Sequence, residues 1–271
     1  MGGRRLARAI IVLLSALVAS HLSLSQQTQS PTLDEILLRL ESNLRHYDTQ
    51  VPNFFCSEHV LSSIVFGKDH QSTITDSIFR LERGSSLGHA TSLTESREIK
   101  AVNGTPVEGK DIHGPAILAG VFSGGLNTVS LSQKACMSYG LQPTKVENSG
   151  LYVVQFTTLP ARQRSSGCVL KEDGFGRAFI DPATMQVTRM ELTVPHHAIL
   201  PALYGVWRIS IDYVPVLFSG QTFWMPSVIT SRATPADADN PTVWSFNAHY
   251  TDYHKLEVTS HILPFSDSKA P

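Results

Sequence analysis

The residues in this chain best suited to chemistry are its 11 histidines, because a neutral imidazole can transfer a proton or bind a metal ion. His196 and His197 are adjacent, and neighbours on a strand point to opposite faces, so this pair is poorly placed to hold one metal. The spacing of His249, His254 and His261 also mixes the two faces. We therefore interpret these histidines as surface or loop residues and predict no metal site.

The carboxylates offer little more. Glu191 and Asp212 fall on predicted strands with polar neighbours, which is typical of a solvated face. A glycosidase-type pair needs two carboxylates roughly 5–10 Å apart across a cleft, and no such arrangement follows from the sequence. The chain also lacks the G-x-S-x-G, P-loop, H-E-x-x-H and dinucleotide-binding patterns. We predict no catalytic residue and no cofactor.

The cysteines Cys56, Cys136 and Cys168 form no C-x-x-C pattern, which disfavours a thioredoxin-like site and a zinc knuckle. Cys136 precedes a predicted strand, and Cys168 lies in the loop-rich stretch that follows it. Neighbouring elements of a meander bring Cα atoms within bridging distance, so we favour a Cys136–Cys168 disulfide. The other two single-bridge choices stay open. Cys56 would then be a buried thiol.

One helix is predicted before any strand. Residues 32–35, Thr-Leu-Asp-Glu, fit a capping box. A single apolar stripe follows at helical spacing and is typical of core packing, and Pro52 closes the segment. The stripe consists of Leu33, Ile36, Leu37, Leu40 and Leu44.

After Pro52 the period changes to two, and about ten strands follow at the spacing of an antiparallel meander. Asn103-Gly104 predicts a tight hairpin turn of type I′. Asn103-Gly104-Thr105 also has the form of a glycosylation acceptor, but we favour the turn because the flanking strands explain it. The predicted strands cover residues 54–66, 72–83, 97–102, 105–107, 151–156, 175–180, 187–194, 207–213, 222–231, 243–250 and 256–262.

Two apolar patterns are candidates for a ligand-binding surface. Residues 113–122 interrupt the strands and predict a short helix placed as a lid, with Ile117, Leu118, Val121 and Phe122 on one side. Within a later strand, four apolar residues alternate with polar ones, so they share a buried face. These four are Trp207, Ile209, Ile211 and Tyr213.

The N-terminus predicts export. Three arginines precede an apolar run over residues 9–24, and small residues at Ser23 and Ser25 offer a cleavage site. A membrane anchor is the weaker interpretation, because the run is too short and interrupted. We predict a signal peptide over residues 1–25, a single domain over 26–271, and a periplasmic or secreted location. The mature part is acidic overall and has no further apolar span, so we expect no nucleic-acid partner and no membrane-spanning segment.

Several motifs together carry a resemblance. They are residues 179–184 (Phe-Ile-Asp-Pro-Ala-Thr) leading into 187–191, residues 52–56 (Pro-Asn-Phe-Phe-Cys), 211–216 (Ile-Asp-Tyr-Val-Pro-Val) and 224–226 (Trp-Met-Pro). With this order of elements, the chain resembles the periplasmic lipoprotein-carrier superfamily, LolA/LolB-like, and more closely uncharacterised exported proteins of soil-type bacteria. The resemblance spans most of residues 32–262. It implies a curved antiparallel sheet, an incomplete barrel around a helical lid, with a hydrophobic concavity that holds acyl chains. This chain departs from the carrier in being longer and in having three cysteines.

The sequence thus favours a mainly β half-barrel that binds a lipid or another apolar ligand without catalysis. The eight apolar residues of the predicted lid and strand are the expected lining. A structural or interaction module of the cell envelope, with a protein partner and a filled interior, is the alternative, and an enzyme is the third. A lumen of several hundred Å³ distinguishes the first interpretation from the second.

Overall fold

The computed structural model describes residues 31–84, 93–107, 121–142, 150–201, 203–237 and 239–257. The chain divides into two compact units, Met1–Thr32 and Leu33–Pro271, and every element described below belongs to the second. The predicted signal peptide lies outside the described residues, so it and the single domain over 26–271 stay predictions. In the described ranges, every helix is too short or too polar to span a bilayer.

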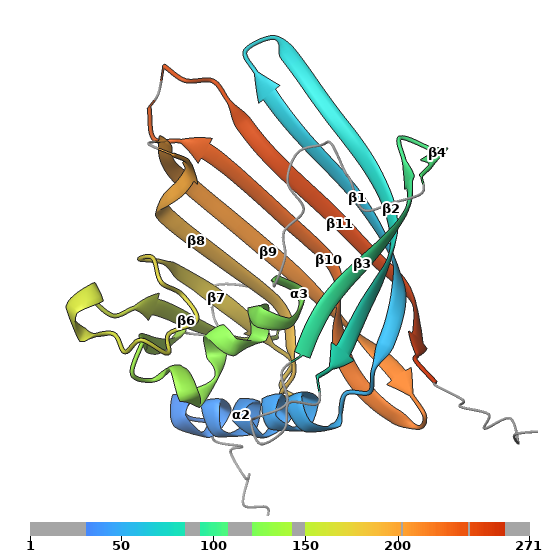
Figure 1. Ribbon diagram of the computed structural model, residues 1–271. Coiled ribbons are helices and arrows are strands. Elements are labelled where there is room, and N and C mark those ends of the chain that lie inside the picture. Colours follow the sequence, from blue (N-terminus) through green and yellow to red (C-terminus); the bar gives the residue numbers. More distant parts are fainter. Residues whose placement is uncertain are drawn as a thin grey trace, which may run out of the picture. The chain divides into compact units, whose positions relative to one another are not determined.

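The predicted N-terminal helix is present as α2, Leu33–Gln50, and continues past Leu44, the last residue of its apolar stripe. Asp34 and Glu35 occupy its first turn, where carboxylates favour the positive end of the helix dipole. Its apolar side lies across one end of the sheet (Figure 1). The buried residues on that side are Ile36, Leu37, Leu40, Leu44 and Tyr47.

The strands form an open antiparallel sheet, as predicted from the alternation. The described strands form an 11-stranded sheet in the order β4-β3-β2-β1-β11-β10-β9-β8-β7-β6-β5 (Figure 1). Their bounds are β1 Phe54–Phe66, β2 Asp69–Arg83, β3 Leu93–Val102, β4 Thr105–Pro106, β5 Met137–Gln142, β6 Tyr152–Thr158, β7 Phe175–Ile180, β8 Val187–Leu200, β9 Leu203–Phe218, β10 Gln221–Pro235 and β11 Val243–Lys255.

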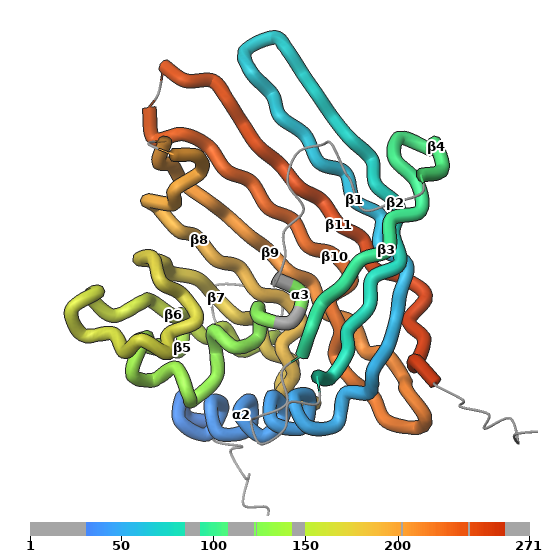
Figure 2. Tube along the Cα trace, viewed as in Figure 1, coloured from blue at the N-terminus to red at the C-terminus, as the bar shows by residue number. Residues whose placement is uncertain are grey.

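Every neighbouring pair is a hairpin except one. β1 pairs with β11, and this contact joins the β1–β4 part to the β5–β11 part. Figure 2 shows these two strands side by side although they lie near opposite ends of the chain. We call the face that carries α2 the core face and the opposite one the back face. A contiguous apolar cluster covers the core face.

Local turn chemistry explains the tight hairpins. Gly67 has a φ of +59° in the turn between β1 and β2. Asn103 and Gly104 have φ values of +50° and +75°, the positive angles of the predicted type I′ turn. The Asn103 side chain also accepts a bond from the Ile74 N–H at 2.8 Å, which fixes the β3–β4 turn to β2.

The described strands differ from the prediction at two places. The segment 256–262 was predicted as a final strand, but β11 ends at Lys255, and Leu256 and Glu257 are not in a strand. Leu256 instead donates its N–H to the carbonyl of Asn53 at 2.8 Å, outside the ladder. The remaining residues of that segment lie outside the described residues. β5 was missed, because Met137–Gln142 has little period-two alternation.

The segment between β4 and β5 is helical where it is described. It contains α3, Val121–Gly124, followed by the 3₁₀ helices η2, Gly125–Val129, and η3, Leu131–Gln133. A third short 3₁₀ helix, η5 at Ala161–Gln163, lies between β6 and β7. The first residues of the predicted lid, 113–120, lie outside the described residues.

A buried ion pair crosses the first strands on the core face. The Arg97 Nε donates to both carboxylate oxygens of Glu58 at 2.9 Å, and Ser77 donates to the same carboxylate at 2.6 Å. The guanidinium lies 4.9 Å above the ring of Phe79. Burial would lower the pKa of Arg97, but Glu58 and Tyr250 outweigh it and raise that pKa. Folding therefore favours the charged form of Arg97.

Candidate functional site

A cavity of about 410 Å³ opens on the core face between β8–β9, the α3–η2 segment and the loop after the disulfide. The residues around it are almost all apolar or glycine, and none of the described ones that line it has an ionisable side chain. The lining consists of Gly124, Gly125, Thr128, Val169, Leu170, Met190, Leu192, Trp207, Ile209 and Ile211. Such a site can hold an apolar group and has no proton donor or acceptor suited to catalysis.

The floor of the cavity comes from the register of β8 and β9. Met190 pairs with Ile211, and Leu192 pairs with Ile209, so their side chains form a continuous apolar surface on the core face. Trp207 bounds this surface and is held from two sides. Its Nε1 donates to the Ser231 hydroxyl at 2.7 Å, and the ring of His197 stacks on it at 4.5 Å between centroids.

The outer wall is the loop between β6 and β7, which is fixed before and after its apolar residues. Before them, a disulfide joins Cys168 to Cys136, with Cα atoms 5.5 Å apart, and this is the pair that the neighbour argument favoured. Gln133 accepts the N–H of Val169 at 2.9 Å. After them, the Glu172 carboxylate lies 2.7 Å from His197 Nδ1. Val169 and Leu170 are therefore held against the cavity by contacts that precede and follow them in the chain.

The roof is the α3–η2 segment, which approaches β9 too closely for a side chain at Gly125. A Cβ there would lie 2.6 Å from Ile211 Cδ1 and 2.8 Å from the Tyr213 hydroxyl. The Thr128 hydroxyl donates to the Gly125 carbonyl at 3.0 Å, so its hydrogen-bond donor is satisfied within the protein. Tyr139 donates to the Thr128 carbonyl at 3.0 Å and ties the segment to β5. A side chain at this position would therefore require the Ile211 and Tyr213 side chains to shift.

Three of the eight predicted lining residues meet at this cavity: Trp207, Ile209 and Ile211. Tyr213 lies one pair farther along β9 and outside the lining. Its hydroxyl is buried without a hydrogen-bond partner among the described residues, and burial raises its pKa well above the usual value.

Of the four predicted lid residues, only Phe122 has a described side chain, and it does not line the cavity. Phe122 instead fills an aromatic cluster, with ring centroids 4.4 Å from Phe79 and 4.9 Å from Tyr250. These two rings belong to β2 and β11. Val121 belongs to α3 by its backbone, and Ile117 and Leu118 lie outside the described residues.

Sequence reasoning missed the rest of the lining. Met190 and Leu192 carry a usable signal, because they alternate with polar residues on the predicted strand 187–194. Val169 and Leu170 carry none beyond their position after Cys168. Loop residues have no period that identifies the face on which they will lie.

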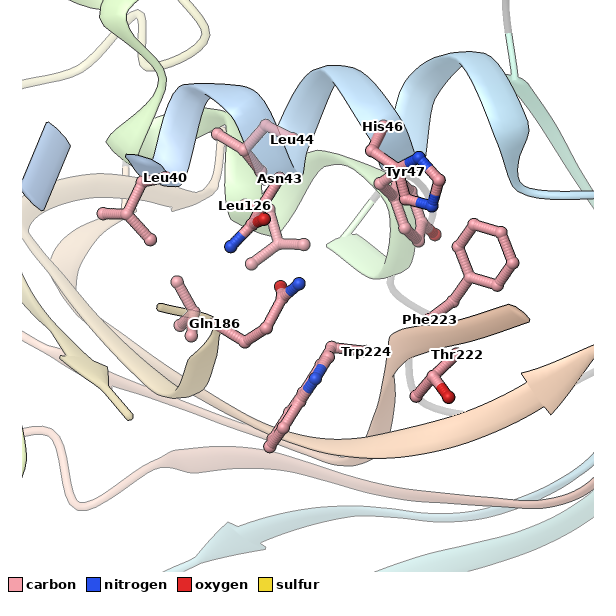
Figure 3. Close-up of a pocket in the computed structure, with 11 residues that line it drawn as sticks. Leu40, Asn43, Leu44, His46, Tyr47, Leu126, Gln186, Thr222, Phe223 and Trp224 are labelled. Carbon is pink, nitrogen blue, oxygen red and sulfur yellow. The ribbon is translucent and has the colours of Figure 1, made fainter. Parts of the chain in front are cut away.

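A second cavity lies under α2 but holds only about 20 Å³, enough for about one water molecule (Figure 3). Leu40, Leu44 and Tyr47 point from the helix towards β10. Asn43 donates to the Met185 carbonyl at 2.6 Å, and His46 stacks on Phe223. This seam positions the helix and does not hold a ligand. The described residues also contain no cluster of three or more His, Cys, Asp and Glu side chains suited to a metal.

Glu41 joins α2 to the segment that forms the roof. Its carboxylate accepts bonds from the Ser130 hydroxyl and the Leu131 N–H, each at 2.9 Å. Burial would raise the pKa of Glu41, but bonds from Arg45, Leu131 and Ser130 outweigh it and lower that pKa. The ionised form is therefore favoured by folding.

We expect Glu41→Gln to lower the free energy of unfolding at pH 7 by about 1–2 kcal/mol. The contribution of Glu41 is fully present above its ordinary pKa of 4.5 and is lost as the pH falls through the lowered folded value. Urea unfolding at pH 7 and pH 3 measures the difference from the native chain, which should shrink at pH 3. Glu82→Gln on exposed β2 is the control, and an equal loss from both variants at pH 7 would contradict the prediction.

No family model and no curated protein matches the chain. Among solved structures, the chain is similar to a LolA superfamily protein from Nitrosomonas europaea, with 10% identity over 85% of this chain and 96% of that one and a TM-score of 0.35. It is also similar to a DUF1329 family protein from Desulfovibrio piger, with 7% identity over 83% of this chain and 92% of that one and a TM-score of 0.36. A putative outer membrane lipoprotein-sorting protein domain from Vibrio parahaemolyticus is similar as well, with 8% identity over 80% of this chain and 91% of that one and a TM-score of 0.36. The first of them has the name of the superfamily that the sequence motifs resemble, and none of the three names gives a ligand.

Proposed function

We propose that this chain is an exported, non-catalytic binding protein for a lipid or another apolar molecule. The observation that carries the proposal is the cavity of about 410 Å³ on the core face. Its size falls within the range of roughly 300–1,000 Å³ common for small-molecule sites. A structural module with a filled interior would leave no such space.

The character of the lining supports an apolar ligand. Leucine, isoleucine, methionine, valine and tryptophan side chains surround the cavity. The polar groups at its border, the Trp207 indole N–H and the Thr128 hydroxyl, already have partners within the protein. A polar ligand would lose its bonds to water there without replacement, whereas an apolar ligand gains from burial.

The Cys136–Cys168 disulfide supports export, because such bonds persist in oxidising compartments and are rare in the cytosol. It also fixes the cavity wall at Val169, so the site depends on it. The wall at Val169 is therefore expected to be fully held only in an oxidising compartment, where the disulfide persists.

Filling the cavity tests the proposal. We expect Ile209→Trp to weaken binding of a fluorescent fatty acid at least tenfold, because the larger ring occupies the space that a ligand needs. Leu217→Trp is the matched control, since it makes the same change on the same strand at a position 67% exposed. Fluorescence titration of each variant gives the affinity, and thermal unfolding checks that each is folded. If Ile209→Trp does not fold, Val169→Trp on the wall loop replaces it.

Native mass spectrometry of the protein from its own host provides the second measurement. We expect a co-purified apolar molecule that is absent from the filled variant. Protein that is repeatedly free of ligand and does not bind the fatty acid would contradict the proposal and favour the interaction module.

A further inference from the structure

Two arginines lie directly opposite one another on the back face of the sheet. Arg208 on β9 and Arg232 on β10 are cross-strand partners, and both are exposed. Within the described ranges, neither has a hydrogen bond or an ion pair. Like charges facing each other across two strands destabilise a sheet, so this pair has a cost that no described neighbour relieves.

The residues beside this arginine pair are hydroxylic. On its other side, Arg208 pairs with Thr193 on β8, and Arg232 pairs with Ser245 on β11. The adjacent row holds Ser210 and Thr230, which bond to each other at 2.8 Å. The arginines are therefore flanked by groups that can donate hydrogen bonds to an anion and by no carboxylate in their own row.

A groove follows these rows across the back face. A cavity of about 550 Å³ is lined by the arginine pair and its hydroxylic neighbours. A second cavity of about 480 Å³ continues it over β6–β8 and shares Glu191 and Thr193 with the first. We call the two together the back groove. It lies on the opposite face of the sheet from the apolar cavity, and Leu192 and Ile209 belong to the lining of both.

The nearest carboxylate does not neutralise the pair. Glu191 is held by Arg177 at 2.7 Å and by Arg189 at 3.0 Å. Arg189 also contacts Asp212 at 3.3 Å, so both acids of this region are already paired. The centre of the back groove thus has excess positive charge, although the whole chain has a formal net charge of −1.

An unsatisfied acceptor lies in the same groove. The Oδ1 atom of Asn247 is buried and has no hydrogen-bond partner among the described residues. Asn247 is the cross-strand partner of Thr230 and lines the cavity. This oxygen has almost no exposed surface, so the ligand contacts that the groove offers are those of its cationic and hydroxylic donors.

We propose that the back groove is a binding site for a phosphate-type oxyanion, held between Arg208 and Arg232. Guanidinium groups bind the oxygens of phosphate in pairs, and such an anion has enough oxygens to engage both arginines at once. The anion relieves the repulsion between them. The site is independent of the apolar cavity, and its ligand is either a free phosphate compound or the phosphate group of an anionic lipid.

Titration with inorganic phosphate at constant ionic strength tests the site on the full chain. Amide chemical shifts report binding, and we expect the largest changes at β9 and β10 beside the arginine pair. Arg232→Gln and Arg208→Gln should each weaken binding at least tenfold. Arg39→Gln on exposed α2 is the control and should leave it unchanged, because Arg39 lies outside the groove. Without phosphate, both groove variants should be as stable as the native chain or more so.

Vesicles distinguish the two sources of the phosphate group. Phosphate binding without selective sedimentation on phosphatidylglycerol vesicles indicates a free compound. Sedimentation on phosphatidylglycerol but not phosphatidylcholine vesicles, lost in Arg232→Gln, indicates a lipid headgroup. Either result supports the oxyanion site. Absence of both, or equal loss from Arg39→Gln, would overturn it and leave the proposed apolar binding function untouched.

Discussion

Replacing Arg97 with methionine is expected to lower the free energy of unfolding by about 3–5 kcal/mol, because it leaves the Glu58 carboxylate buried without its cation. The Glu58 side chain is fully buried, and Arg97 is 11% exposed. Such a carboxylate must either stay charged in an apolar core or take up a proton, and both are unfavourable. Urea unfolding at pH 7 measures the loss.

The double variant Glu58→Gln with Arg97→Met distinguishes the loss of the ion pair from the cost of leaving one buried charge unpaired. We expect it to be more stable than the single Arg97→Met variant, because no buried charge is left unpaired. Arg80→Met, which breaks the exposed Arg80–Glu98 pair between β2 and β3, should cost less than about 1 kcal/mol. Equal losses from Arg97→Met and Arg80→Met would mean that burial of the pair has no energetic role.

Removing the disulfide should have the second largest effect. We expect Cys136→Ser with Cys168→Ser to lower the free energy of unfolding by about 3–4 kcal/mol, because the bridge closes a segment with a sequence separation of 32 and restricts the unfolded chain. The wall at Val169 would then be held by Gln133 and by the Glu172–His197 contact. Guanidinium unfolding and fatty-acid release rates measure stability and binding separately.

A reducing agent provides the internal control for that prediction. It should destabilise the native chain and leave the double serine variant unchanged. Cys56→Ala should keep the full sensitivity, because Cys56 is buried outside the bridge. If the native chain with both thiols verified as reduced is as stable as the oxidised chain, the bridge does not stabilise the fold.

The sequence contained most of the local structure. The capping residues and apolar stripe predicted α2, and period-two alternation predicted β7, the first part of β8 and the middle of β9. Asn103-Gly104 predicted its turn through the positive φ that the pair tolerates. These features are properties of adjacent residues, so composition and spacing reveal them.

What could not be predicted depends on contacts between distant segments. The pairing of β1 with β11 follows from no local pattern, and neither does the opposition of Arg208 and Arg232, which requires the exact register of β9 on β10. The cavity has the same origin, because Val169 and Ile209 meet only after the loop is bridged and the sheet is formed. Phe122 was predicted as lining because its apolarity does not reveal which part of the core it fills.

The β1–β11 ladder also sets the order of events during synthesis. Ser57 cannot meet Thr251 until β11 has been made, so the first hairpin emerges with one strand edge unpaired. A contact between strands so distant in sequence slows folding. The ladder therefore leaves this edge of β1 exposed until β11 has been synthesised and has paired with it.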